Sequence, residues 1–333
     1  MKFKNKNIII ILIIISIVIL VSFYLKNSKK KSVEDFSGEH LVVYSCLRGE
    51  ETKAILELFK QKYNCSYEYI QLPTQEAIAR IKDEKDSPKA DVFLSGTGDG
   101  LKDLAKSNAI KKYISENDEN VPDAFKGKDG KWIAFEAHPL SIVINKKVLE
   151  NQLGNEKTPI PTNFKDLTNP KYKGKIAMPN PLTSGTGYSF ISYLDRLLGD
   201  DEYRKVISKI KDNTGILSTR GYNVVQNVAS GEYPIGISYL NNIKFMEKTI
   251  SDFIVITPKD TGVDIHGVGI INKATNTKVA DEFVDFIISN NFQEKLKEFS
   301  TSIPIIKYND YEDKYLIQNL DNKESVIKIW ENS

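Results

Sequence analysis

Short apolar runs alternate along the chain with longer segments in which apolar residues recur every three or four positions. In the first third of the chain, apolar runs predict strands at Leu41–Cys46 and Asp91–Leu94, and Tyr67–Leu72 is predicted to be another strand. Helical spacing of apolar side chains predicts helices between them, at Glu50–Lys62 and Gln75–Lys82. Strands joined by helices at such short spacing are typical of a parallel sheet with helices on both faces. We therefore expect an α/β protein.

The pattern further along the chain predicts a second lobe inserted into the first. The apolar run Trp132–Asn145 is interrupted by His138-Pro139, and we place the first crossing between lobes there. Phe253–Thr257 is expected to be the returning strand. The C-terminal stretch Tyr311–Trp330 is predicted to be helical and to pack on the first lobe. The expected organisation is two lobes with two crossings: residues 39–138 plus 262–333 in lobe 1, and 139–261 in lobe 2.

The N-terminus carries a separate signal. Ile8–Leu25 is apolar apart from two serines, and eighteen residues of helix span about 27 Å, close to the thickness of a bilayer core. Lysines flank the run, and neither a small-residue cleavage site nor a lipobox cysteine follows it. We therefore predict an uncleaved signal-anchor with its basic flank in residues 1–31, and a binding domain outside the cell membrane. The alternative is a secretory signal that is cut at a poor site.

Charge and residue usage exclude several classes of protein. Residues 1–31 hold seven lysines and no acids, and the rest of the chain carries 39 basic and 44 acidic side chains. A nucleic-acid-binding face is therefore not expected. The three histidines have no metal-motif spacing, and no CxxC is present, so neither a metal nor a cofactor is expected. Cys46 and Cys65 are expected to be free thiols, and the protein is expected to be a monomer.

One tetrapeptide occurs twice, each time between a predicted strand and a predicted helix. The copies are Ser95-Gly96-Thr97-Gly98 and, within Thr183-Ser184-Gly185-Thr186-Gly187, residues 184–187. The first amides of a helix have no internal partner and carry partial positive charge, so they can hold an anion. Glycines allow close approach of the backbone, and hydroxyls add donors. We expect the two copies to face each other across a cleft; alternatively, they are ordinary strand-to-helix turns.

Three more residues are candidates for ligand contact. Ser45 lies at the end of a predicted strand, where ligands approach open α/β sheets, although it could simply cap a helix. Arg220 precedes a short predicted helix and could hold an anion through two hydrogen bonds, or lie at the surface. Tyr239 ends the predicted strand Tyr233–Tyr239 and could contact a ligand or pack in the core.

Several segments together resemble a known family. MPNPLTSGTGYSFISYL, GEYPIGISYL and the VYS that closes the first strand are similar to segments of the ferric-iron and organophosphate branch of ABC-transporter substrate-binding proteins. The resemblance covers Leu41–Ile305. It implies the type II periplasmic-binding fold: two α/β lobes, a ligand in the cleft between them, and closure on binding. It also implies an ABC permease and ATPase as partners, and no catalysis.

The same resemblance bears on the ligand. Ferric-binding members carry two adjacent tyrosines where this chain reads Tyr239-Leu240-Asn241-Asn242, with only one. Members that bind phosphonates or phosphate esters are more similar, and Asp264 matches an acid that they carry and could pair with a ligand ammonium group. His266 occupies their next acidic position. The expected ligand is a small phosphonate or phosphate ester, and Fe(III) is the alternative.

Two other functions remain open. An anchored hydrolase could use Ser184 as its nucleophile, but the G-x-S-x-G elbow is missing. A sensor ectodomain would also suit a single anchor.

Overall fold

The computed structural model describes residues 34–154, 159–248, 253–306, 315–316 and 323–333. The predicted signal-anchor, residues 1–31, lies outside this set. Among the described helices, none is both long and apolar enough to cross a membrane. Residues 37–333 form one compact unit, which contains both lobes.

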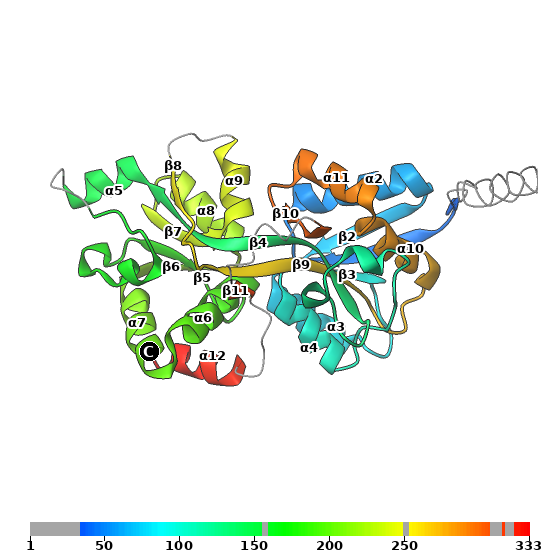
Figure 1. Cartoon of the computed structure of the whole chain (residues 1–333), viewed down its shortest axis with the longest axis horizontal. Coiled ribbons are helices and arrows are strands. Elements are labelled where there is room, and N and C mark those ends of the chain that lie inside the picture. Colours follow the sequence, from blue (N-terminus) through cyan, green and yellow to red (C-terminus); the bar gives the residue numbers. More distant parts are fainter. Residues whose placement is uncertain (1–33, 155–158, 249–252, 307–314, 317–322) are drawn as a thin grey trace, which may run out of the picture. The chain divides into compact units, whose positions relative to one another are not determined.

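Parallel strands form the centre of the first lobe. β1 (His40–Ser45) pairs with β2 (Ser66–Gln71) on one side and with β3 (Val92–Ser95) on the other. The sequence predicts these three strands to within one residue at each end. Helices cover both faces of this sheet (Figure 1): α2 (Gly49–Tyr63), α3 (Thr74–Asp83), α4 (Gly98–Lys106), α10 (Thr277–Ile287) and α11 (Asn290–Phe299).

The second lobe repeats this arrangement with its own parallel strands. β5 (Ile176–Pro179) lies between β6 (Thr214–Ser218) and β7 (Ile235–Tyr239). Its helices are α5 (Lys146–Leu153), α6 (Gly185–Leu198), α7 (Asp200–Asn213), α8 (Gly221–Ala229) and α9 (Leu240–Glu247). Short 3-10 turns cover Phe164–Thr168 and Pro170–Tyr172 after α5. Two others, Asp118–Asn120 and Asp123–Phe125, follow α4 earlier in the chain.

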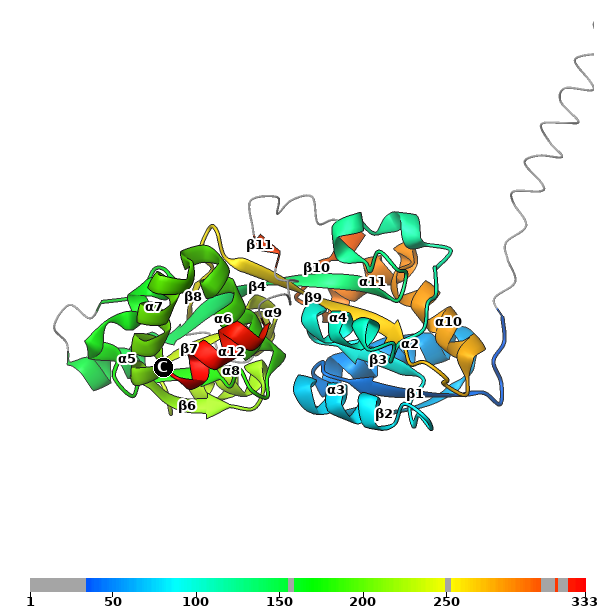
Figure 2. The ribbon, with the colours of Figure 1, turned by 90° about the horizontal axis from the view of Figure 1, so that it is seen from below.

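Two long strands belong to both lobes. β4 (Trp132–Asn145) and β9 (Gly262–Ile270) run antiparallel to each other between the lobes, as Figures 1 and 2 show from two directions. β4 is continuous, so the expected interruption at His138-Pro139 is wrong. The strand changes neighbours there instead: it pairs with β9 up to Pro139 and with β7 and β8 (Phe253–Ile256) from Leu140 onward. Proline, which cannot donate to a ladder, is tolerated at such a transition.

The C-terminal helix lies elsewhere than predicted. α12 (Lys323–Glu331) packs on α6 and α7 of the second lobe, not on the first lobe (Figure 1). Val326, Ile329 and Trp330 are buried in the core of the second lobe. Since α11 packs in the first lobe, the chain passes between the lobes a third time. On the way, β10 (Ile303–Pro304) pairs with β4, and β11 (Tyr315–Leu316) pairs with β9.

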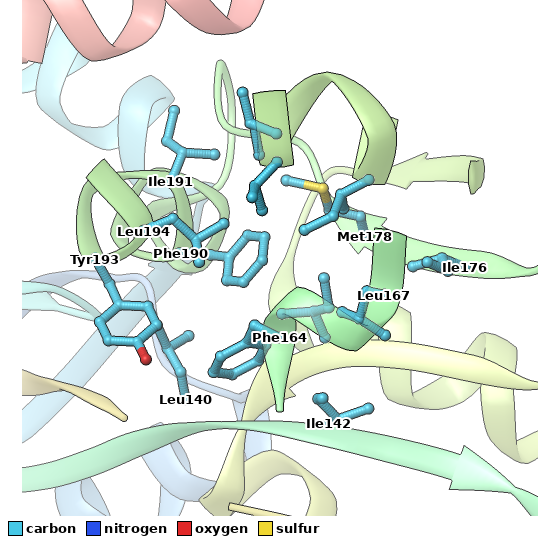
Figure 3. Packing of buried hydrophobic residues seen from close by; sticks show 14 of the residues in the cluster. Leu140, Ile142, Phe164, Leu167, Ile176, Met178, Phe190, Ile191, Tyr193 and Leu194 are labelled. Atoms are coloured by element: carbon cyan, nitrogen blue, oxygen red, sulfur yellow. The ribbon is translucent and has the colours of Figure 1, made fainter. Parts of the chain in front are cut away.

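The core of the second lobe fixes the start of α6. Figure 3 shows Phe190, Ile191 and Leu194 of α6 packed toward Phe164 and Met178. These side chains are fully buried or nearly so. Burial of a large apolar side chain stabilises a fold by about 2 kcal/mol. The first turn of α6 is therefore held in place by packing, and it directs the second SGTG segment toward the first lobe.

Candidate ligand-binding site between the lobes

A cavity of about 290 Å³ lies between the two lobes. The first lobe contributes the β1–α2 turn, the start of α3 and the β3–α4 turn. The second lobe contributes the starts of α6 and α8 and the end of β7. The residues that line it are mostly polar: Cys46, Leu47, Arg48, Gly49, Glu50, Glu51, Gln71, Pro73, Thr74, Gly96, Thr97, Ser184, Gly185, Thr186, Thr219, Arg220, Gly221, Tyr222, Asn223, Gln226, Tyr239, Asn242 and His266.

The starts of α2, α3, α6 and α8 are among the helix starts that line this cavity. α2, α3 and α8 begin without any side-chain hydrogen bond to their first amides. α6 begins with Ser184, whose hydroxyl accepts a hydrogen bond from the Gly187 amide at 3.4 Å. The first amides of each helix lack intrahelical partners, and the helix dipole adds partial positive charge. Two helix starts from each lobe therefore give the cavity the character of an anion site.

The lobes touch at the second SGTG segment. A Cβ atom on Gly185 would lie 2.4 Å from Thr97 Cγ2 and 2.8 Å from Thr74 Oγ1. Only glycine allows the start of α6 to approach the first lobe this closely. Close by, the Gln75 amide donates to the Thr183 carbonyl at 3.4 Å. The structure is therefore a form in which the lobes are in contact.

Arg220 extends from the second lobe to the first. Its Nη2 donates to the carbonyls of Cys46 at 2.9 Å and Leu47 at 3.0 Å, and the residue lines the cavity. Burial lowers the pKa of Arg220, but an arginine remains charged at neutral pH. The remaining donors of its guanidinium are available to an anion in the cavity.

A second arginine at the cavity, Arg48, makes its hydrogen bonds within the protein. Arg48 donates to Glu51 at 2.9 Å and to the Asn241 carbonyl at 3.2 Å, and its guanidinium lies 4.2 Å from the centre of the Phe245 ring. The ion pair with Glu51 is almost fully buried. Arg48 adds positive charge to the cavity wall but is less free than Arg220 to rearrange around a ligand.

The floor of the cavity holds a buried charge cluster. His266 Nδ1 bonds Glu136 and lies 3.7 Å from Glu51 Oε1. Burial lowers the pKa of His266, but Glu136 outweighs it and raises the pKa to about 9. Burial, together with the charge of Glu51, raises the pKa of Glu136 to about 7. Burial opposes ionisation of Glu51 as well, but His266 and Arg48 hold its pKa well below the usual range.

Carboxylates and an imidazole so close together are also a possible metal-ligand set. Here, however, a protonated imidazole and a guanidinium already face the two carboxyl groups, so the cluster contains its own cations. Arg48 already occupies the outer oxygen of Glu51. We therefore interpret this cluster as an ion-pair network beneath the cavity and derive no metal chemistry from it.

Asp264 lies behind the cavity wall rather than in it. Its carboxylate accepts hydrogen bonds from the Gly98 amide at 2.9 Å, from Tyr239 OH at 2.9 Å, and from Ser189 Oγ. Burial and the nearby Asp99 raise the pKa of Asp264 to about 6. Because the Asp264 carboxylate accepts a hydrogen bond from the Gly98 amide, the helix start in the first SGTG segment is already neutralised by a protein group. In the second segment the helix start is capped by the Ser184 hydroxyl, a neutral group, and so keeps its partial positive charge.

The structure brings seven of the twelve predicted site residues to the cavity: Gly96, Thr97, Ser184, Gly185, Thr186, Arg220 and Tyr239. Ser45, Ser95, Thr183, Gly187 and Asp264 are not among the residues that line it. The hydroxyls of Ser45 and Ser95 bond within their own turns, to the Leu47 and Thr97 amides. Gly187 instead lets α6 approach strand β5, since a Cβ there would lie 2.4 Å from the Pro179 carbonyl.

Sequence reasoning missed the start of α2 as part of the site. Arg48, Gly49, Glu50 and Glu51 line the cavity but match no motif. Their position directly after β1 is the one available signal, because ligands of open α/β sheets bind outside the carboxyl ends of the strands. Cys46, at the same edge, is a free thiol, and so is Cys65, as expected.

Two α/β lobes that share two long strands and enclose a polar cavity define a solute-binding protein of the type II periplasmic fold. The chain belongs to the bacterial extracellular solute-binding proteins, whose family model matches residues 87–323. Within them it is placed in the branch that includes iron and sugar-phosphate binders. Proteins of this family bind solutes and deliver them to ABC importers.

Individual relatives span this branch. The periplasmic binding protein AfuA from Actinobacillus pleuropneumoniae, solved with fructose-6-phosphate, is 25% identical with a TM-score of 0.79, over 89% of this chain and 98% of that one. Iron-bound HitA from Pseudomonas aeruginosa is 18% identical with a TM-score of 0.76, over 88% and 99%. The iron uptake protein A1 of Synechocystis sp. is 24% identical over 297 residues, 82% of this chain and 78% of that protein.

Proposed function

We propose that this protein binds a small phosphonate or phosphate ester in the interlobe cavity and delivers it to an ABC permease. The observation that carries the proposal is that helix starts from both lobes, those of α2, α3, α6 and α8, line one cavity together with Arg220. Helix-start amides and a guanidinium suit a compact, multiply charged oxyanion. The fructose-6-phosphate bound to AfuA is a ligand of this kind.

Iron is the alternative, because relatives such as HitA bind it. Fe(III) favours deprotonated oxygen ligands. Burial and the neighbouring Asp264 raise the pKa of Tyr239 well above its usual value. Its hydroxyl also donates to Asp264. Tyr239 is thus held as a neutral phenol, which favours an oxyanion over Fe(III).

Native mass spectrometry of the purified protein tests this proposal first, by revealing any small molecule that it carries. Isothermal titration then follows with 2-aminoethylphosphonate, fructose 6-phosphate, inorganic phosphate and Fe(III) citrate. The proposal predicts saturable one-to-one binding of at least one phosphorus compound. Tight Fe(III) binding with a visible tyrosinate charge-transfer band, and no binding of the phosphorus compounds, would replace it with the iron alternative.

We also propose that residues 1–31 anchor the binding domain to the outer face of the cell membrane. The support is the length of the apolar run and the missing cleavage signals. The intact mass of the protein extracted from membranes should include residues 1–31. A mature N-terminus near Lys26 would show that this segment is a cleaved secretory signal.

A further inference from the structure

The C-terminal helix α12 is attached to one lobe and reaches the other. Val326, Ile329 and Trp330 fix it in the core of the second lobe. Lys323, its first residue, directs its ammonium group across the cleft to the first lobe. There Nζ lies 3.3 Å from Asp99 Oδ2 and 3.4 Å from Gln75 Oε1. Asp99 lies in the first turn of α4, and Gln75 lies in the first turn of α3.

The ammonium group is also held by its own lobe. It lies 4.9 Å from the centre of the Tyr188 ring on α6, a distance at which a cation is attracted to the face of an aromatic ring. Lys323 therefore contacts α6 of the second lobe and the starts of α3 and α4 of the first. These contacts are long-range in sequence: Asp99 is 224 residues away from Lys323.

The acceptor, Asp99, depends on this contact. Its side chain is 4% exposed, and that of Lys323 is 25% exposed. The other carboxylate oxygen, Oδ1, is buried without a hydrogen-bond partner. A buried carboxylate that loses the cation paired with it is destabilised unless water reaches it. Separation of the lobes would break the pair, so the pair stabilises the closed arrangement selectively.

We infer that Lys323 is a positioning residue that sets how readily the cleft closes. It acts through the closed-to-open equilibrium and touches no ligand, since it is not among the residues that line the cavity. Any differential interaction of this kind shifts the population of the two arrangements, and apparent affinity with it. The inference holds for whichever solute the cavity takes.

Pulsed electron–electron double resonance on the full chain tests it. Spin labels at Lys60→Cys on α2 and Lys209→Cys on α7 report the distance between the lobes; both positions are exposed. The chain without these substitutions, treated with label, measures any reaction of Cys46 and Cys65. The variants are Lys323→Met, Asp99→Asn and their combination. Lys328→Met, an exposed lysine of the same helix, is the matched control.

Distances are recorded without added ligand and with inorganic phosphate. Lys323→Met should lower the closed-to-open ratio about two- to five-fold, as expected for a partly exposed ion pair, and Lys328→Met should leave it unchanged. The combined variant should match the single ones, because each substitution already removes the pair. Equal ratios in Lys323→Met and the unsubstituted chain, additive effects, or no closed population in either condition would overturn the inference. If phosphate leaves the ratio unchanged but Lys323→Met lowers it, the inference stands and the proposed ligand class loses support.

Discussion

At the residue scale, Arg220 combines two tasks. It bonds backbone carbonyls of the opposite lobe, and it lines the cavity. Arg220→Met should weaken binding of the phosphorus ligand about 10- to 100-fold, since a hydrogen bond to a charged oxygen contributes about 1.5–3 kcal/mol. Isothermal titration measures this loss. Arg204→Met, on the exposed face of α7, is the control and should bind like the unsubstituted chain. Equal affinity of the two variants would remove Arg220 from the site.

His266 predicts a pH dependence of stability. Its pKa is raised above the unfolded value by Glu136, so the stabilisation is fully present below about pH 6.5 and is lost as the pH rises through about 9. Urea unfolding between pH 6.5 and 9 should show a fall in the free energy of unfolding. This fall should be smaller in His266→Gln, where ionisation of Glu136 still contributes to it, and this variant should also be less stable at pH 6.5. His40→Gln, at a partly exposed histidine, should retain the full fall. A fall of the same size in His266→Gln would contradict the charge cluster.

The sequence predicts the local features of the site but not the contacts between side chains that are distant in the chain. The glycines and hydroxyls of the second SGTG segment could be predicted, because helix starts next to strand ends are local features. The partners of Asp264 could not, since Gly98, Ser189 and Tyr239 come from three distant segments. The same holds for the contact of Glu51 with His266, which is more than two hundred residues away in the chain.

At the element scale, the strands of the first lobe were predictable: β1 and β3 contain continuous apolar runs, and in β2 the strand-favouring Tyr67, Tyr69 and Ile70 lie among polar residues. The position of α12 was not. Its apolar stripe shows that one face must be buried, but Val326, Ile329 and Trp330 would suit either lobe. The expectation at Pro139 was wrong for a different reason. Proline cannot donate to a strand ladder, so a break in the strand was expected, but β4 changes its neighbouring strands at this residue and continues.

The packing of α12 gives an element-scale prediction. Trp330 is buried in the core of the second lobe. Trp330→Ala should lower the free energy of unfolding by about 3 kcal/mol, through lost burial and the cavity left behind. Chemical denaturation followed by circular dichroism measures this change. Lys328→Ala in the same helix is the control and should shift stability by less than about 0.5 kcal/mol. Equal stabilities of the two variants would mean that α12 does not pack on the second lobe.

At the scale of the whole molecule, function requires that the lobes come together around a solute. Gly185 is a point of close approach between the lobes, because any side chain there would meet Thr97 and Thr74. Gly185→Ala should therefore raise the dissociation constant about tenfold while leaving the thermal midpoint of the free protein nearly unchanged. Isothermal titration and thermal unfolding test both parts.

The matched control for this substitution is Gly49→Ala. Gly49 also begins a helix that lines the cavity, but the nearest atom to its Cβ position is 3.6 Å away, an ordinary contact. This variant should bind within about twofold of the unsubstituted chain. If Gly185→Ala binds equally well, the lobes do not approach this closely in the bound state.

The proposed function requires that one phosphorus-containing anion is held between helix starts from both lobes. A crystal structure of the complex with the tightest-binding compound of the titration panel shows whether it is. We predict phosphoryl oxygens within hydrogen-bond distance of the first amides of α6 and α8 and of Arg220, with the starts of α2 and α3 closing from the other lobe. A phosphoryl group held by one lobe alone, or a metal ion bound through Tyr239 in its place, would be incompatible with this arrangement.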